Sequence, residues 1–416
     1  MKKMIYISLL ASSLLAGQED MQSLKEQLKA QQKTIAELMQ RLDRIENNQE
    51  TNIYVENEAT TEYVDTMSQP AQINASFNQN AYIPDIGLIL NSSIVSRNID
   101  NQAYPEYGTP GYILPGEAEL PYNKDRGFNF NYAEVSMYSA VDPYFDAFAI
   151  FHMEADSFEI DEGYVTTRDL DYGLRVKAGK FKSAIGRYNE LHQHAWDFSE
   201  QTLLYSNFFG PEGLSDPGVQ LQWVAPTSTY LMVGVEAMQG TNEQSFGYEK
   251  GNSLYNTYVK TSLDLSDDTS VLAGVSFMHG KNTFDGDTNI YAADLTVQEQ
   301  LSSYSSLAWQ SEYMYRDMAE DSFHKRQDAM YSQLVYTHNQ NYAGGVRFDA
   351  LMKNNAGDAY ANMYTAMIEY KPFEFSRLRL EYSVDESKYF DGQQKNVQQL
   401  MLELNVAVGA HSAHNF

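Results

Sequence analysis

The chain has 416 residues, no cysteine and a formal net charge of −27, with 56 acidic against 29 basic side chains. This acidity excludes nucleic acid as a natural partner, and the missing cysteines exclude a disulfide scaffold. After the first sixteen positions no apolar run is long enough, at about 20 residues, to predict a membrane-spanning helix. The mean hydropathy of −0.48 suits a soluble protein, but such an average misses a chain in which every second residue is apolar.

The N-terminus has the pattern of an export signal. Two lysines precede an apolar run, and the small residues Ala16 and Gly17 follow it. Gln18 occupies the position at which a lipoprotein would carry its lipidated cysteine. We therefore predict that residues 1–17 are a signal peptide that is removed without lipid attachment.

A heptad pattern follows at 18–48. Apolar residues recur seven apart in two interleaved sets: Met21, Leu28, Ile35 and Leu42, then Leu24, Leu38 and Ile45. This spacing predicts a periplasmic left-handed coiled coil, although a lone amphipathic helix would give the same pattern. Gln31 is the one polar residue of the seam and could fix its register. A three-stranded coil would suit a homotrimer, and its surface could contact the cell wall. Residues 49–84 are polar, without core-forming periodicity, and predict a linker.

From residue 85 to 416 the chain reads as sixteen short segments in which apolar and polar residues alternate. In the last segment Leu400, Leu402 and Leu404 fall on one face, while Met401 and Glu403 fall on the other. An even number of such segments predicts an all-β fold, a 16-stranded antiparallel transmembrane β-barrel. A sheet in a bilayer must close on itself, because lipid cannot satisfy an open edge. With the export signal, this predicts a protein of the Gram-negative outer membrane, in contact with its lipids.

The connections alternate between long and short, which predicts the orientation of the barrel. If the N-terminus is periplasmic, the long connections face outward; those expected are 99–127, 182–216, 240–254, 280–287, 316–327 and 386–396. The last strand then returns Phe416 to the periplasm, where a terminal aromatic is the usual signal for the barrel assembly machinery. The expected strands are 86–96, 128–139, 146–154, 160–168, 173–181, 217–225, 229–239, 255–265, 269–279, 288–298, 305–315, 328–338, 342–351, 360–372, 376–385 and 397–408.

The third outer loop, 182–216, is too rich in aromatic and apolar residues for a freely solvated loop, and we expect it to fold inward and narrow the lumen. A lid or a trimer contact would also fit. Its charged residues include Arg187, Glu190, Asp197 and Glu200, and the segment is acidic overall. The basic residues expected on the facing wall are Arg175, Lys177, Arg347, Arg377 and Arg379. Opposed charges of this kind would set up a transverse field across a pore, or would pair and hold the loop in place.

Two histidines of this loop, His192 and His194, are two residues apart, and their side chains are of a type that could ligate Zn²⁺. A second pair, His411 and His414, stands near the C-terminus. Histidines in loops more often hydrogen-bond to backbone or water, so no resident cofactor is expected, and Zn²⁺ is the one metal that the pattern suggests.

Several motifs resemble a family of porin-like outer-membrane proteins of Gram-negative bacteria. They are Ala178-Gly179-Lys180-Phe181, Gly186-Arg187, His192-Gln193-His194-Ala195-Trp196-Asp197-Phe198, Phe208-Phe209-Gly210-Pro211-Glu212-Gly213-Leu214 and the ending Gly409 to Phe416. Some members of that family carry names that invoke zinc regulation or TonB-dependent uptake. The resemblance implies a porin-like channel with a link to metal. A TonB receptor does not follow, because a 22-stranded barrel with its plug needs a much longer chain.

The sequence therefore predicts a passive diffusion channel for small hydrophilic solutes or ions. One alternative is an outer-membrane channel selective for a divalent metal such as zinc, or for metal chelates. Another is an envelope tether that acts through the coiled coil. An enzyme is not expected, because no Ser/His/Asp arrangement stands in a recognisable context.

Overall fold

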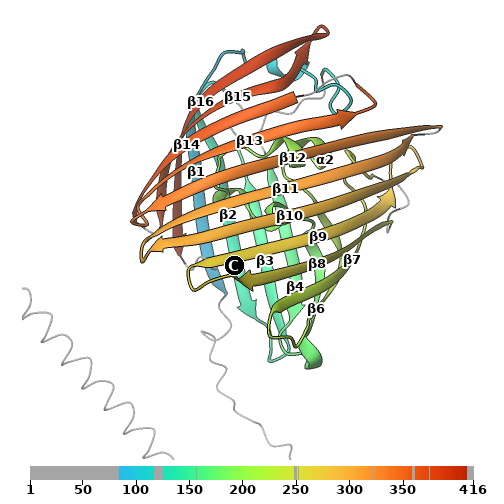
Figure 1. Ribbon diagram of the computed structural model, residues 1–416, viewed down its shortest axis with the longest axis vertical. Helices are drawn as coiled ribbons and strands as arrows, with labels where there is room; N and C mark the ends of the chain where they lie inside the picture. Colours follow the sequence, from blue (N-terminus) through green and yellow to red (C-terminus); the bar gives the residue numbers. More distant parts are fainter. Residues whose placement is uncertain are drawn as a thin grey trace, which may run out of the picture. The chain divides into compact units, whose positions relative to one another are not determined.

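Sixteen antiparallel strands pair in chain order, and the first strand pairs with the last, so the sheet is a closed barrel (Figure 1). The computed structural model describes residues 84–116, 125–155, 157–247, 251, 253–320, 322–357, 361–373 and 375–409. The expected signal peptide, coiled coil and linker lie outside the described residues. So do His411, His414 and Phe416.

The strands match the sixteen expected segments in number and in order. They are β1 (Asp85–Arg97), β2 (Gly127–Ala140), β3 (Phe145–Met153), β4 (Phe158–Thr167), β5 (Leu174–Lys182), β6 (Ser215–Val224), β7 (Tyr230–Met238), β8 (Leu254–Asp264), β9 (Thr269–Lys281), β10 (Asp287–Ser302), β11 (Ser305–Glu320), β12 (Phe323–His338), β13 (Tyr342–Asn354), β14 (Ala361–Phe373), β15 (Ser376–Phe390) and β16 (Gln393–Gly409).

Side-chain exposure alternates clearly along β14 and β16, as a barrel in lipid requires. In β14 the outward-facing Ile368 is 63% exposed, whereas its inward-facing neighbour Met367 is 4% exposed. In β16 Leu402 points outward and Glu403 is buried inside. The apolar set therefore covers the outer face of the cylinder, while polar side chains and three apolar clusters of the described residues are buried inside.

Two of the expected outer loops are wrong. Residues 316–327 and 386–396 were expected as long loops, but β11 continues to Glu320, and β12 begins at Phe323. In the same way β15 runs to Phe390, and β16 begins at Gln393. A strand that extends beyond the bilayer needs no apolar face, so its sequence does not alternate between apolar and polar residues there. Its backbone hydrogen bonds to the neighbouring strand continue all the same.

Three long connections remain on the outer side. We name them loop 1 (98–126), loop 3 (183–214) and loop 4 (239–253). Loop 3 carries the short helix α2 (Leu203–Phe208), which lies against β12 and β13 (Figure 1). Among the described residues, no helix is long and apolar enough to cross a membrane.

Candidate functional site

Loop 3 packs its apolar side chains against the inner wall of the barrel. Leu204, Tyr205 and Phe208 are fully buried, and they belong to one apolar cluster with wall residues such as Met314 and Tyr331. Gly186 permits the close approach at the start of the loop. Its backbone is left-handed at φ 62°, and an added Cβ would lie 2.2 Å from the Glu312 carboxylate.

Carboxylates of the wall accept hydrogen bonds from the backbone of loop 3. The pairs are Ala184 N to Glu236 at 2.9 Å, Tyr188 N to Glu312 at 2.8 Å, Ser199 N to Glu381 at 2.8 Å and Leu203 N to Asp349 at 3.0 Å. These carboxylates stand on β7, β11, β15 and β13, so the loop is attached to strands widely spaced around the cylinder. Charge-assisted bonds of this kind satisfy backbone groups that the interior would otherwise leave unpaired.

Arginines of the wall donate to carbonyl groups of the same loop. Arg347 donates to the Glu200 carbonyl at 2.8 Å, and its Nε lies 2.9 Å from Asp349. Arg379 donates to the Trp196 carbonyl at 2.8 Å. Arg377 donates to the His194 carbonyl, also at 2.8 Å. Each of these guanidinium groups therefore holds the loop by its backbone.

The same arginines also form ion pairs within the wall. Arg379 pairs with Glu369 at 2.6 Å, and Arg377 pairs with Glu403 at 3.1 Å. Arg347 and Arg379 are almost fully buried, at 2% and 1% exposure. These arginines are therefore paired with carboxylates and bonded to loop 3. The sequence left open whether such charges create a transverse field or hold the loop in place, and these contacts hold the loop.

A second group of charges attaches loop 3 to the opposite part of the wall. His192 places Nε2 2.7 Å from Glu162 and Nδ1 3.1 Å from Asp161. His194 Nδ1 lies 3.3 Å from Glu134, and the Lys182 ammonium lies 3.6 Å from Asp161. We call these six residues the histidine cluster.

A β-bulge explains why two consecutive acidic residues meet one histidine. In the pairing of β3 with β4, Ile150 lies opposite Glu162 and Phe151 lies opposite Ile160, so Asp161 is the extra residue. In a regular strand Asp161 would point to lipid, because neighbours alternate between faces. The bulge turns it to the same side as Glu162.

Both ring nitrogens of His192 face carboxylates, and an imidazole can donate from both only when it is protonated. Burial opposes the charge, yet Glu134, Asp161 and Glu162 outweigh it and raise the pKa of His192 to about 10. Among the described residues, no group of three or more His, Cys, Asp or Glu side chains is arranged to hold a metal ion. His192 would have to lose its proton before it could ligate Zn²⁺.

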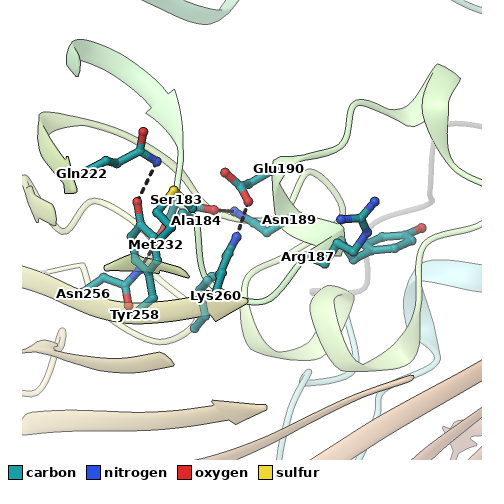
Figure 2. Close-up of polar contacts among 12 residues, drawn as sticks. Ser183, Ala184, Arg187, Asn189, Glu190, Gln222, Met232, Asn256, Tyr258 and Lys260 are labelled. Atoms are coloured by element: carbon teal, nitrogen blue, oxygen red, sulfur yellow. Dashed lines mark hydrogen bonds and ion pairs between the residues drawn. The ribbon is translucent and has the colours of Figure 1, made fainter. Parts of the chain in front are cut away.

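The remaining charged residues predicted for the pore are Glu190, Arg187, Arg175 and Lys177. The last two stand in the first half of β5, which is the periplasmic half if the N-terminus is periplasmic. Glu190 pairs with Lys260 of β8 (Figure 2). On β5, Arg175 donates to Thr166 at 2.8 Å, and the Lys177 ammonium lies 4.7 Å from the centre of the Tyr164 ring. Within the described part of the chain, Arg175, Lys177 and Arg187 form no ion pair. These cations face the lumen with less compensation than those of β13 and β15.

Three carboxyl groups of loop 3 are partly buried. This burial raises the pKa of the Asp197, Glu200 and Glu212 carboxyls, and Asp197 accepts a hydrogen bond from Gln333 at 2.8 Å.

The sequence prediction missed four of the wall carboxylates that attach the loop. Glu134, Glu162, Glu236 and Glu312 all occupy inward positions of their strands, and an acidic residue at an inward position was a signal that could have identified each of them. The consecutive pair Asp161-Glu162 within one strand was a second signal, because a regular strand would send one of the two charges into lipid.

The fold and interior define a porin-like, 16-stranded antiparallel β-barrel. No family model matches the chain. It is 35% identical over 385 residues to an uncharacterised protein of Aquifex aeolicus, which covers 82% of this chain and 81% of that protein. The chain belongs to the same family as that protein.

Two solved structures share the fold at low sequence identity. One is an anion-selective porin from Comamonas acidovorans, with a TM-score of 0.53 and 10% identity, which covers 78% of this chain and 99% of that chain. The other is the outer-membrane channel DcaP of Acinetobacter baumannii, with a TM-score of 0.53 and 11% identity, which covers 78% of this chain and 97% of that chain. At this identity the likeness establishes the architecture alone.

Proposed function

We propose that the protein is a passive diffusion channel of the outer membrane for small hydrophilic solutes or ions, with loop 3 as its constriction. The single observation that carries the proposal is the attachment of loop 3 to β7, β11, β13 and β15 from inside a closed barrel. Because loop 3 is attached through its backbone and its side chains, it would keep the width of the channel constant. Arg175, Lys177, Arg187 and the pair Glu190–Lys260 are the charges beside it that solutes would meet.

Single-channel recording in a planar bilayer tests this proposal. The purified full chain should give ohmic steps of uniform size. Replacing 188–209 with a short Gly-Ser linker should raise the conductance severalfold, because it removes the segment that fills the lumen. A chain that inserts into the bilayer but carries no current would reject the channel, and an unchanged conductance in the linker variant would reject loop 3 as the constriction.

A second candidate function is a channel selective for divalent metal, and the histidine cluster is the observation that favours it. Zn²⁺ would have to displace the His192 proton and bind among Glu134, Asp161 and Glu162. Zn²⁺ added to the bath should then block the current of the natural chain and not that of a variant carrying both H192A and H194A. Equal currents with and without Zn²⁺ would remove this candidate.

We also propose a homotrimer joined by the predicted coiled coil at 18–48. The support is the heptad pattern in the sequence. Native mass spectrometry of the full chain should give three copies, and of a chain without 18–48 should give fewer. A monomer for the full chain would contradict it.

A further inference from the structure

A chamber lies on the outer side of loop 3, separate from the charges of Arg175, Lys177, Arg187, Glu190 and Lys260 described above. It has a volume of about 90 Å³ and is bounded by loop 1, loop 3, loop 4 and the wall strands β1, β14, β15 and β16. At roughly 10–15 Å³ for each water-sized position, it holds about six to nine non-hydrogen atoms. This is the size of a small metabolite.

Lys388 is the most informative residue of the chamber. It is 7% exposed, and among the described residues its ammonium forms no hydrogen bond or ion pair. It lies over the ring of Tyr104 in loop 1, at 5.8 Å from the ring centre. Tyr104, Asp385 and Glu200 offset part of the cost of burying this ammonium, but none of them bonds it directly, which leaves a place for the anionic group of a ligand.

A β-bulge places Lys388 there. Asp385 pairs with Val397, whereas Lys388 pairs with Lys395, so β15 has one residue too many in this stretch. Ser387 and Lys388 are both buried as a result, although neighbours in a regular strand would point to opposite faces. The bulge in β15 therefore places the Lys388 side chain on the chamber side of the strand.

The chamber carries charges of both signs. Arg97 of β1 lies over the same Tyr104 ring at 4.9 Å and donates to Gln399 at 3.1 Å. Two carboxylates, Glu200 of loop 3 and Asp385 of β15, line the same cavity. A simple anion would be attracted by the two cations and repelled by the two carboxylates. A solute that carries both charges is compatible with all four.

The rest of the lining is apolar. Leu203, Met363 and Val397 border the chamber and would accept a hydrocarbon side chain. Burial raises the pKa of the Glu200 carboxyl, and a ligand ammonium beside it would oppose that shift. Size, charge and apolar surface thus agree on one chemical class.

The geometry points to a binding site for a zwitterionic amino acid with an apolar side chain, its carboxylate on Lys388 and Arg97 and its ammonium on Asp385 and Glu200. The site goes beyond the proposed channel, because binding to it requires no current. In a channel it would concentrate the solute just outside the constriction formed by loop 3.

Isothermal titration calorimetry of the full chain in detergent tests the site with L-leucine as the probe. Two analogues each lack one charge: 4-methylpentanoate lacks the ammonium, and 3-methylbutylamine lacks the carboxylate. L-leucine should bind at least about tenfold more tightly than either, since a charge-assisted hydrogen bond to a buried group contributes about that factor. No heat with L-leucine, or equal affinity for L-leucine and 4-methylpentanoate, would overturn the proposal.

Variants connect the binding to the named side chains. K388M should weaken L-leucine binding by about tenfold or more. D385N should weaken L-leucine binding and tighten 4-methylpentanoate binding, because it removes a carboxylate that attracts an ammonium and repels an anion. K281M is the matched control, because Lys281 lies at the outer end of β9 in an exposed pair with Asp287. Strand-type circular dichroism identifies folded variants. Undiminished L-leucine binding in folded K388M would overturn the assignment, and the result is independent of any failure to conduct.

Discussion

At the scale of single residues, the interior of this barrel uses charge to hold backbone in place. Arg347 and Asp349 form an ion pair that is fully buried at both side chains, and between them they bond the Glu200 carbonyl and the Leu203 amide. Taking two charges out of water is costly, and their attraction offsets that cost only when the remaining donors and acceptors are satisfied. Here the loop supplies the remaining partners.

This arrangement predicts an asymmetry between single and double variants. R347M should lower the free energy of unfolding by about 3–5 kcal/mol, because it leaves the Asp349 carboxylate buried without its partner. The double change R347M with D349L should cost less than R347M alone. Urea titration in detergent micelles, followed by tryptophan fluorescence, measures both. A double variant less stable than R347M would contradict this explanation.

His192 predicts a dependence on pH with a definite sign. Its pKa is raised from 6.5 to about 10 in the folded chain, so its contribution to stability is complete below pH 6.5 and falls as the pH rises toward 10. The natural chain should therefore lose more stability than H192Q between pH 7 and pH 10. Urea midpoints at several pH values measure the difference. Parallel losses in the two proteins would show that His192 is not protonated in the fold.

At the scale of elements, the strands were predictable from the sequence and the course of loop 3 was not. Alternation along β16 identified the faces of Leu402 and Glu403 correctly, because lipid requires it. It failed at 316–327, where the strands leave the bilayer. The path of loop 3 depends on partners such as Glu312, which lies more than a hundred residues away from Tyr188 in the chain. No local pattern records such a pairing.

Gly186 offers a test of this element. Alanine at this position would be strained by the left-handed backbone, and its Cβ would collide with Glu312 and with the Tyr205 hydroxyl. G186A should lower the free energy of unfolding by about 1–3 kcal/mol and make single-channel currents noisier, because the start of loop 3 loses its attachment. G392A is the control, since nothing lies within 4 Å of the Cβ that it would add and its φ of 72° is similarly left-handed. Equal effects would assign the loss to backbone strain alone.

At the scale of the whole molecule, the outer face of the cylinder is set by lipid. Ile368 lies at the middle of β14, and Val408 lies at the inner end of β16. I368R should cost about 2–4 kcal/mol in lipid vesicles, while V408R should cost about 0–1 kcal/mol, because the penalty for a charge falls toward the interface. Urea unfolding in vesicles measures both. Equal costs would mean that this face does not contact the hydrocarbon core.

The pairing of β1 with β16 has a consequence for the order of events during biogenesis. Arg97 and Gln399, which bond across this seam, are 302 positions apart in the chain. No shorter piece of the chain can complete the ring, and contacts so distant in sequence form slowly. Until the final strand arrives, every assembly intermediate has two open edges that invite aggregation. Pairing of β16 with β1 is therefore the last step of assembly, because only that step removes both open edges.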